Sequence, residues 1–201
     1  MPTSLRSRAL CGAPMMTLGV IAVLLSACNT SPSASGSSQT LGLGHPPSAE
    51  QIAAIDIDAN AAGAGLPAGQ GTSETGAVVY AQKCAVCHGP HGEGIEKNPK
   101  LIGHEPAAGF AFASDVKAVK TIGNYWPYAT TLYDYLHRTM PFTAPGSLTP
   151  DETYGLVAFL LVENGIVPAN TVVNAKSLPA ITMPARTHFV PDNREGGSSF
   201  R

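Results

Sequence analysis

The sequence predicts an all-α domain of roughly a hundred residues, preceded by an export signal and a flexible tether. Three segments combine helix-start signals with apolar residues at helical spacing, namely 74–83, 131–139 and 149–164. The 21 Gly and 17 Pro residues indicate long loops between these helices. The third observation is the box Cys84-Ala85-Val86-Cys87-His88, around which the other elements are arranged.

This Cys-x-x-Cys-His box is the attachment signature of c-type haem. Its two thiols are spaced to reach two vinyl groups on one edge of the macrocycle, and the next residue places an imidazole under the iron. We therefore expect Cys84 and Cys87 to bind one covalent haem c and His88 to be its proximal ligand. A redox dithiol or half of a zinc site is the alternative, but no second pair of zinc ligands follows.

Residues 1–27 have the pattern of a signal peptide. Two arginines precede the apolar run 18–25, which is too short to span a membrane. Leu25-Ser26-Ala27-Cys28 resembles the lipobox of bacterial lipoproteins. That resemblance implies cleavage before Cys28, acylation of this residue, and a lipid-anchored protein on the periplasmic side of a bacterial membrane. An ordinary signal peptide cut near Ala27 is the alternative.

Residues 28–71 are predicted to be a lipidated flexible tether with one short ordered segment, because Ser, Thr, Gly and Ala predominate. The ordered segment begins with a helix-start signal at 48–51, and isoleucines follow at 52, 55 and 57. Asp56 and Asp58 are interpreted as surface carboxylates, since a Ca²⁺ loop needs several more oxygen ligands. Residues 61–71 are expected to be linker.

The folded domain is expected over residues 72–167. Thr72 or Ser73 caps the first helix, in which Gly76 permits close approach by another helix. The second helix is expected to begin with the pair Thr131 and Asp134 and to end before Pro141. Thr149-Pro150-Asp151-Glu152 begins the closing helix, which should end at Asn164-Gly165 and pack on the first helix. Residues 168–201 form an extension on or near the domain.

Met140 is the predicted distal ligand of the haem iron. It lies 52 residues after His88, held between the end of a helix and Pro141. A neutral thioether favours reduced iron and raises the potential. Met183, His137 and an open coordination site are the alternatives. His91 and His104 are interpreted as surface or structural residues.

Three aromatic residues, Tyr125, Trp126 and Tyr128, lie within four positions. One interpretation is a wall of the haem pocket with a hydrogen bond to a propionate. The other is core packing with the polar groups turned to water, and the two are compatible.

The haem box, Met140-Pro141 and the closing helix resemble a class I cytochrome c, which implies that fold. The stretches 122–130, 140–142 and 148–154 further resemble the cytochrome subunit of bacterial sulfite and sulfane (Sox-type) dehydrogenases. That resemblance implies a molybdenum-containing catalytic subunit as the electron donor, and another cytochrome or a terminal oxidase as the acceptor. The chain would then be an electron-transfer subunit rather than an enzyme on its own.

Other function classes stay open at this point. A generic lipid-anchored carrier would serve another dehydrogenase or an oxidase. A haem enzyme or gas sensor would have Met140 displaced from the iron, and a haem-bearing structural subunit would be redox-silent. The 12 basic and 14 acidic residues form no basic patch, so nucleic acid is not an expected partner.

Overall fold

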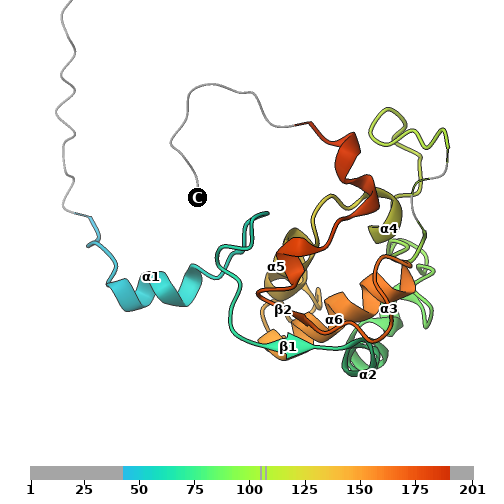
Figure 1. Ribbon diagram of the computed structural model, residues 1–201. Coiled ribbons are helices and arrows are strands. Elements are labelled where there is room, and N and C mark those ends of the chain that lie inside the picture. The colour runs from blue at the N-terminus through green and yellow to red at the C-terminus, as the bar shows by residue number, and fades with distance from the viewer. Residues whose placement is uncertain (1–42, 105, 107, 191–201) are drawn as a thin grey trace, which may run out of the picture. The chain divides into compact units, whose positions relative to one another are not determined.

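The computed structural model describes residues 43–104, 106 and 108–190. Its named elements all belong to the compact unit that begins at Pro47. Figure 1 shows their arrangement, and their order is α1 (Ala49–Ile55), β1 (Gln70–Gly71), α2 (Ser73–Lys83), α3 (Ala85–His88), α4 (Ile122–Tyr125), α5 (Ala129–Thr139), α6 (Pro150–Glu163), β2 (Val173–Asn174), and the 3₁₀ helices η1 (Leu178–Ala180) and η2 (Pro184–His188). Within the described ranges, no helix is both long and apolar enough to cross a membrane.

Local capping signals set the start of most helices. Capping boxes open α1 at Ser48, α2 at Thr72 and α6 at Thr149, and in each the side chain accepts a hydrogen bond from the backbone N–H three residues on. These three starts confirm the predicted ones, because a capping box satisfies orphan backbone donors within one turn of chain. A fourth box, at Thr121, begins the short helix α4, which the sequence analysis did not predict.

Helix α5 begins two residues earlier than predicted. It starts at Ala129 after Tyr128, and the expected pair Thr131 and Asp134 does not cap it. Thr131 Oγ1 instead donates to the Tyr128 carbonyl and accepts from the indole of Trp126, at 3.0 Å each. Local partners of Thr131 and the distant partner of Asp134, the Ala59 N–H, therefore replace the cap that the sequence suggested.

Helix α6 forms the centre of the hydrophobic core. Most of its side chains are buried, on more than one face, which is typical of a core helix rather than a surface helix. Helices α2, α4 and α5 and both short strands pack against it. Its C-cap residue Asn164 is also buried, and this side chain connects α6 to the loop after the haem box: it accepts from the N–H groups of Gly103 and Gly123 and donates to the Leu160 carbonyl.

Two glycines allow α2 to approach α6 closely. A Cβ atom added to Gly76 would lie 1.9 Å from the carbonyl oxygen of Gly155. A Cβ atom added to Gly155 would lie 2.9 Å from Thr75 Oγ1. The expected packing of the closing helix on the helix before the haem box is therefore confirmed. The ion pair Lys83–Glu152, at 2.6 Å, joins the same two helices.

Residues 61–71 differ from the predicted linker, because they make specific contacts with the domain. The Thr130 hydroxyl donates to the Ala61 carbonyl at 2.9 Å, and the Tyr154 hydroxyl donates to the Pro67 carbonyl at 2.8 Å. Gly71 is buried in β1, which pairs antiparallel with β2. A Gly-rich composition predicted flexibility here, but the small residues permit close contact with α6.

The described part of the C-terminal extension packs on the domain, as expected. Val173, Leu178 and Met183 are buried in the same hydrophobic core as α6. Helix η2 lies against α4, and the Arg186 guanidinium is stacked over the ring of Tyr128 at 4.4 Å. The extension therefore covers the segment that holds the aromatic run.

Candidate haem site

Helices α2 and α3 place the Cys-x-x-Cys-His box in a single helical turn. Cys84 is the C-cap of α2, and its carbonyl accepts from the backbone N–H groups of Cys87 and His88, at 3.1 and 2.9 Å. Neither cysteine forms a disulfide bond, and Cys84 is half-buried whereas Cys87 is exposed. The box therefore presents two sulfur atoms and an imidazole from a short, hydrogen-bonded piece of backbone.

The half-buried Cys84 occupies an apolar environment. Burial is the main cause that raises the pKa of its thiol to about 11; Lys83 opposes this effect and Cys87 adds to it. Burial disfavours a thiolate because it removes the charge from water. A thioether sulfur carries no charge, so the environment of Cys84 fits a sulfur that is bonded to a macrocycle.

The imidazole of His88 is oriented for metal binding by a backbone carbonyl. His88 Nδ1 lies 2.9 Å from the carbonyl oxygen of Pro99. A carbonyl oxygen only accepts, so this hydrogen bond requires the proton on Nδ1 and leaves the lone pair of Nε2 available. Metal-bound histidines characteristically donate their second ring N–H in this manner. The residues present therefore fit a haem iron on His88 Nε2.

Pro99 was missed by the sequence analysis. Its contact with His88 depends on how the glycine-rich loop folds back. The Gly92 carbonyl accepts from the N–H groups of Leu101 and Ile102, and the His88 carbonyl accepts from Gly94. Gly92 and Gly94 have positive φ angles, of 67° and 83°, which side chains resist. The run of glycines in the sequence indicates a tightly turning loop, but it does not identify the Pro99 carbonyl as the partner of His88.

The two candidate methionines have different environments. Met140 is half-buried at the C-cap of α5, where its N–H donates to the Leu136 carbonyl, and it lies at the margin of the core together with Cys84 and Trp126. Met183 is 1% exposed and belongs to the core itself. Core filling is the usual role of a buried methionine, so the surroundings favour Met140 over Met183 as a ligand.

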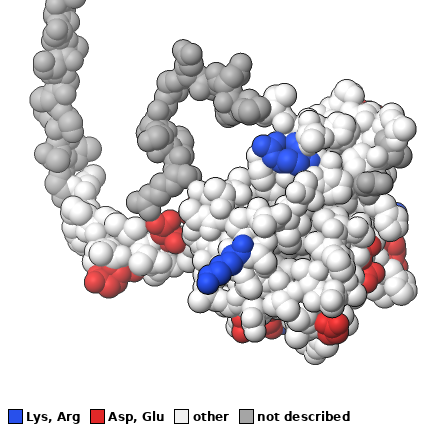
Figure 2. Space-filling model, in the orientation of Figure 1, with Lys and Arg blue, Asp and Glu red and all other residues white. Residues whose placement is uncertain are grey.

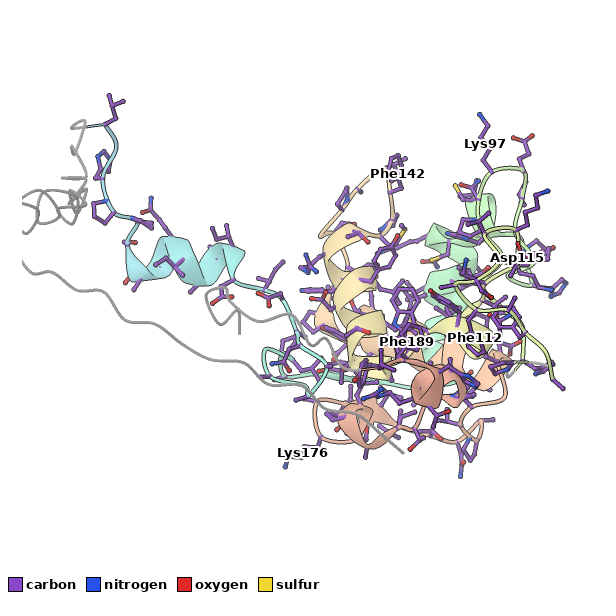
Figure 3. All side chains as sticks on the ribbon, turned by 90° about the horizontal axis from the view of Figure 1, so that it is seen from above. Lys97, Phe112, Asp115, Phe142, Lys176 and Phe189 are labelled. Carbon is purple, nitrogen blue, oxygen red and sulfur yellow. The ribbon has the colours of Figure 1, made fainter. Side chains whose placement is uncertain are left out.

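The loops after the haem box and after Met140 rise on the same side of the protein. Figure 3 shows this for Lys97, which follows α3, and for Phe142, which follows α5. Phe142 is exposed, as is Val86 between the two cysteines. The box and Met140 thus lie at the bases of two loops that point to the same side of the protein.

The aromatic run divides between two roles. Trp126 is half-buried and packs edge-on against Tyr135 of α5, with ring centroids 5.5 Å apart. The indole N–H of Trp126 is bound to Thr131, so it is not directed at a propionate. Tyr125 contacts Phe112 and Phe189 instead, which Figure 3 shows close together. The sequence analysis did not identify Tyr135, since its contact with Trp126 depends on how the chain folds between them.

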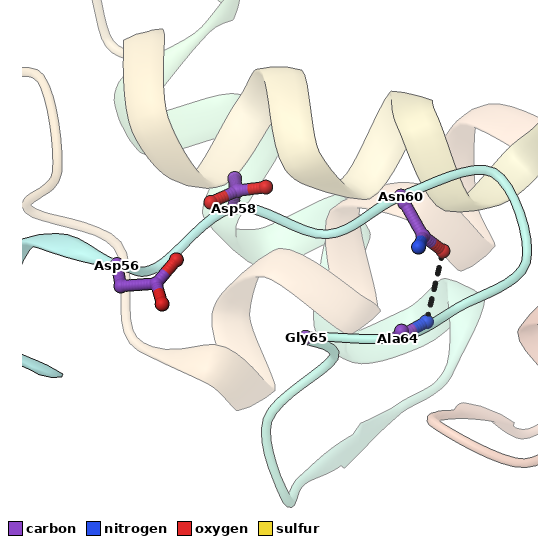
Figure 4. A pocket seen from close by; sticks show the side chains of 5 residues that line it. All are labelled: Asp56, Asp58, Asn60, Ala64 and Gly65. Atoms are coloured by element: carbon purple, nitrogen blue, oxygen red, sulfur yellow. Dashed lines mark hydrogen bonds between the residues drawn. The ribbon is translucent and has the colours of Figure 1, made fainter. Parts of the chain in front are cut away.

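The remaining histidines and acidic residues make no second metal site in the described part of the chain, where no group of three or more His, Cys, Asp or Glu converges. His91 and His104 are exposed, and His137 packs on Tyr133. Asp56 and Asp58 line the pocket of Figure 4, together with Asn60, Ala64 and Gly65. Cys28, the predicted lipidation site, lies outside the described residues.

Comparison with known proteins identifies the family. The cytochrome c family model matches residues 73–162. A chain of the sulfane dehydrogenase SoxCD from Paracoccus pantotrophus is 41% identical, with a TM-score of 0.67, over 77% of this chain and 73% of that chain. The chain belongs to the cytochrome c family. The predicted fold class is thereby confirmed: a mostly helical cytochrome c fold with two very short strands.

Membership of the family implies that this cytochrome c carries covalent haem c and is an electron carrier, as the sequence predicted. A second structure, the thiosulfate dehydrogenase TsdBA from Marichromatium purpuratum in its as-isolated form, is 26% identical over 45% of this cytochrome and 17% of that chain. Its TM-score is 0.33, so no conclusion is based on it. Among curated proteins, no match was found.

Proposed function

We propose that this cytochrome c takes single electrons from a molybdenum-containing dehydrogenase of sulfite or a related sulfur compound and passes them to another cytochrome or a terminal oxidase. The observation that carries the proposal is the 41% identity to a chain of the sulfane dehydrogenase SoxCD, which extends over roughly three quarters of both chains. An electron-transfer subunit of this kind is not an enzyme alone.

Four residues would hold one haem. Cys84 and Cys87 would supply the thioether bonds, His88 Nε2 the proximal bond and Met140 the distal sulfur. When bound, the haem supplies a one-electron redox couple. The Pro99 carbonyl fixes the ring orientation and the tautomer of His88, and Trp126 packs at the margin of the core, as Met140 does. With His88 and Met140 both bound to the iron, the protein would leave no site on it for a substrate.

The ligand assignment is tested with a matched pair of variants. Met140→Leu and Met183→Leu keep the volume of the side chain nearly constant, so both should fold. We expect Met140→Leu to lower the reduction potential and to let the reduced protein bind carbon monoxide, while Met183→Leu leaves both properties unchanged. Unchanged spectra in Met140→Leu would refute the assignment and favour a different ligand or an open, sensor-like site.

The donor is tested in membranes of the source organism, with a strain that lacks this chain as the control. The haem α-band is followed after addition of sulfite, thiosulfate and an alcohol. Rapid reduction by a sulfur compound, dependent on this chain, is the expected result. Reduction by quinol-linked donors alone would identify a generic carrier and contradict the sulfur-dehydrogenase proposal.

We also propose export by residues 1–27 and anchoring through acylated Cys28. Cys28→Ala should move the cytochrome from the membrane fraction to the soluble periplasmic fraction without loss of haem. Retention of the variant in the membrane fraction would contradict the anchor. Several acyl chains on one residue are sufficient for stable membrane attachment, whereas one is not.

A further inference from the structure

The segment 48–58, which contains α1, presents apolar side chains to solvent. Ile52, Ile55 and Ile57 are 45%, 81% and 39% exposed, and α1 has no buried residue. The helix is nevertheless defined by a complete capping box between Ser48 and Gln51. A helix this short is marginal in water by itself, so an ordered helix with exposed isoleucines indicates a surface that another molecule covers.

We propose that segment 48–58 is a docking element that binds an apolar groove with a basic rim on the dehydrogenase partner. The proposal rests on the proposed function, because the occupant is the electron-donating protein. It assigns partner binding to a segment that lies outside the haem-holding part of the chain. Three observations favour this occupant. They are the acidic charge of segment 48–58, the attachment of the segment to α5, and the extent of the likeness to the SoxCD chain.

The charge of the segment favours a basic protein surface over a lipid surface. Glu50, Asp56 and Asp58 lie in the same segment as the three isoleucines, and no Lys or Arg occurs between residues 43 and 82. Figure 2 shows acidic atoms over the region where Figure 1 places α1. Membrane surfaces on which amphipathic helices lie are usually anionic and attract basic residues. A groove rimmed by Lys or Arg matches both the isoleucines and the carboxylates.

The segment is attached to the helix that leads to Met140. Directly after Asp58, the buried Ala59 donates its N–H to Asp134 Oδ1 of α5 at 2.8 Å. Burial alone would raise the pKa of Asp134, but the hydrogen bonds from Arg138 and Ala59 hold that pKa below its ordinary value, so the carboxylate is ionised at neutral pH. The end of the segment is therefore fixed before binding, which lowers the entropic cost of docking.

This attachment also brings a docked partner near the redox centre. Asp134 lies in the middle of α5, six residues before its C-cap Met140, which corresponds to about 9 Å along a helix. A partner that holds segment 48–58 is therefore anchored next to the helix that carries the predicted distal ligand. Docking at this segment and electron transfer at the haem are compatible in one complex.

The likeness to the SoxCD chain includes this segment. It covers 77% of the 201 residues, which is about 155 residues. Even if a continuous stretch of that length ended at the last residue, it would begin at about residue 47. The cytochrome c family model, by contrast, begins at residue 73. Segment 48–58 is thus shared with a cytochrome of a dehydrogenase and is not part of the general haem-binding core, which favours the dehydrogenase as the occupant.

The test compares two double variants of the full-length haem-loaded protein. Ile52→Ser with Ile55→Ser removes the apolar contact, and Val116→Ser with Val119→Ser is the matched control, since both valines are also exposed. The probe is the molybdenum-containing subunit of the source organism, isolated by its oxidation of sulfite with ferricyanide. Binding is measured by biolayer interferometry at low and high salt. Reduction of the cytochrome by sulfite is measured at several cytochrome concentrations.

We expect the isoleucine variant to raise the Kd and the KM for the cytochrome about tenfold or more, as expected for loss of buried apolar contact. Its limiting rate, haem spectrum and melting temperature should not change. The control pair should leave the Kd unchanged. A second variant, Glu50→Gln with Asp58→Asn, should slow association and weaken its salt dependence.

Several outcomes would overturn the docking proposal. The first two are an unchanged Kd in the isoleucine variant and an equal loss of affinity in the valine control. The third is that wild type binds anionic phospholipid vesicles and the isoleucine variant does not. The fourth is that wild type forms a dimer and the isoleucine variant is a monomer. If the wild-type cytochrome itself is not reduced by sulfite with the subunit, the proposed function fails as well. Normal reduction of wild type with an unchanged Kd in the variant refutes the docking segment alone.

Discussion

Replacing Gly76 with alanine should destabilise the protein, even though alanine is the better helix former. In a helix interior the exchange of glycine for alanine gains about 1 kcal/mol in propensity. At Gly76, however, the new Cβ would lie 1.9 Å from the backbone oxygen of Gly155. A backbone atom cannot rotate away, so α2 and α6 have to separate by about 1.5 Å to reach a normal contact distance.

Such overpacking costs about 1–3 kcal/mol, and the rigid contact at Gly155 places Gly76→Ala at the upper end of that range. When the gain in helix propensity is subtracted, the free energy of unfolding should fall by about 1–2 kcal/mol. This corresponds to several degrees in melting temperature for a domain of this size. The measurement is denaturant unfolding of the haem-loaded protein, followed by far-UV circular dichroism.

The control for Gly76→Ala is a pair of variants at Val78, an exposed position of the same helix. The difference between Val78→Ala and Val78→Gly measures the propensity term alone and should be about 1 kcal/mol in favour of alanine. If Gly76→Ala stabilised the protein by the same amount, the close crossing of α2 and α6 would be refuted.

Three further variants test the packing and electrostatics around the site. Asn164→Ala should lower the free energy of unfolding by about 2–4 kcal/mol, because it leaves the partly buried N–H of Gly103 and the buried N–H of Gly123 in α4 without partners; denaturant unfolding measures it. Met183→Ala should cost about 2–5 kcal/mol as a core cavity while the haem spectrum stays unchanged, and a spectral change would contradict its core role. Glu152→Gln should cost at most about 1 kcal/mol at pH 7. The Lys83 ammonium lowers the pKa of Glu152 in the folded state, so this difference should disappear as the pH falls through that pKa, and a difference that grows in acid would refute the ion pair.

Local signals made most of the helices predictable from the sequence. The starts at Ser48, Thr72 and Thr149 depend on side chains that bond to backbone three residues away, so a short stretch of sequence contains all the partners. The haem box is local in the same sense, because one turn of helix fixes its three functional side chains.

The predictions that were wrong or missing depend on distant partners. Asp134 binds the N–H of Ala59, 75 residues earlier, and therefore does not cap α5. The orientation of His88 depends on the Pro99 carbonyl, which no side-chain pattern can reveal. Residues 61–71 have the composition of a linker, and only their contacts with Thr130 and Tyr154 show that they belong to the fold.

The proposed ligands are held with unequal strength. Cys84, Cys87 and His88 lie in one turn that continues α2, and α2 is fixed to α6 by the glycine crossing and the ion pair Lys83–Glu152. Met140, by contrast, is the C-cap residue after α5, and the loop that follows it is exposed from 142 to 147. Segments with few buried contacts open at the lowest free energy. On the proposed ligation, mild denaturation should therefore release the distal sulfur first and leave the proximal histidine in place. Because α5 also carries the attachment of segment 48–58, a docked partner would stabilise the weaker of the two sides.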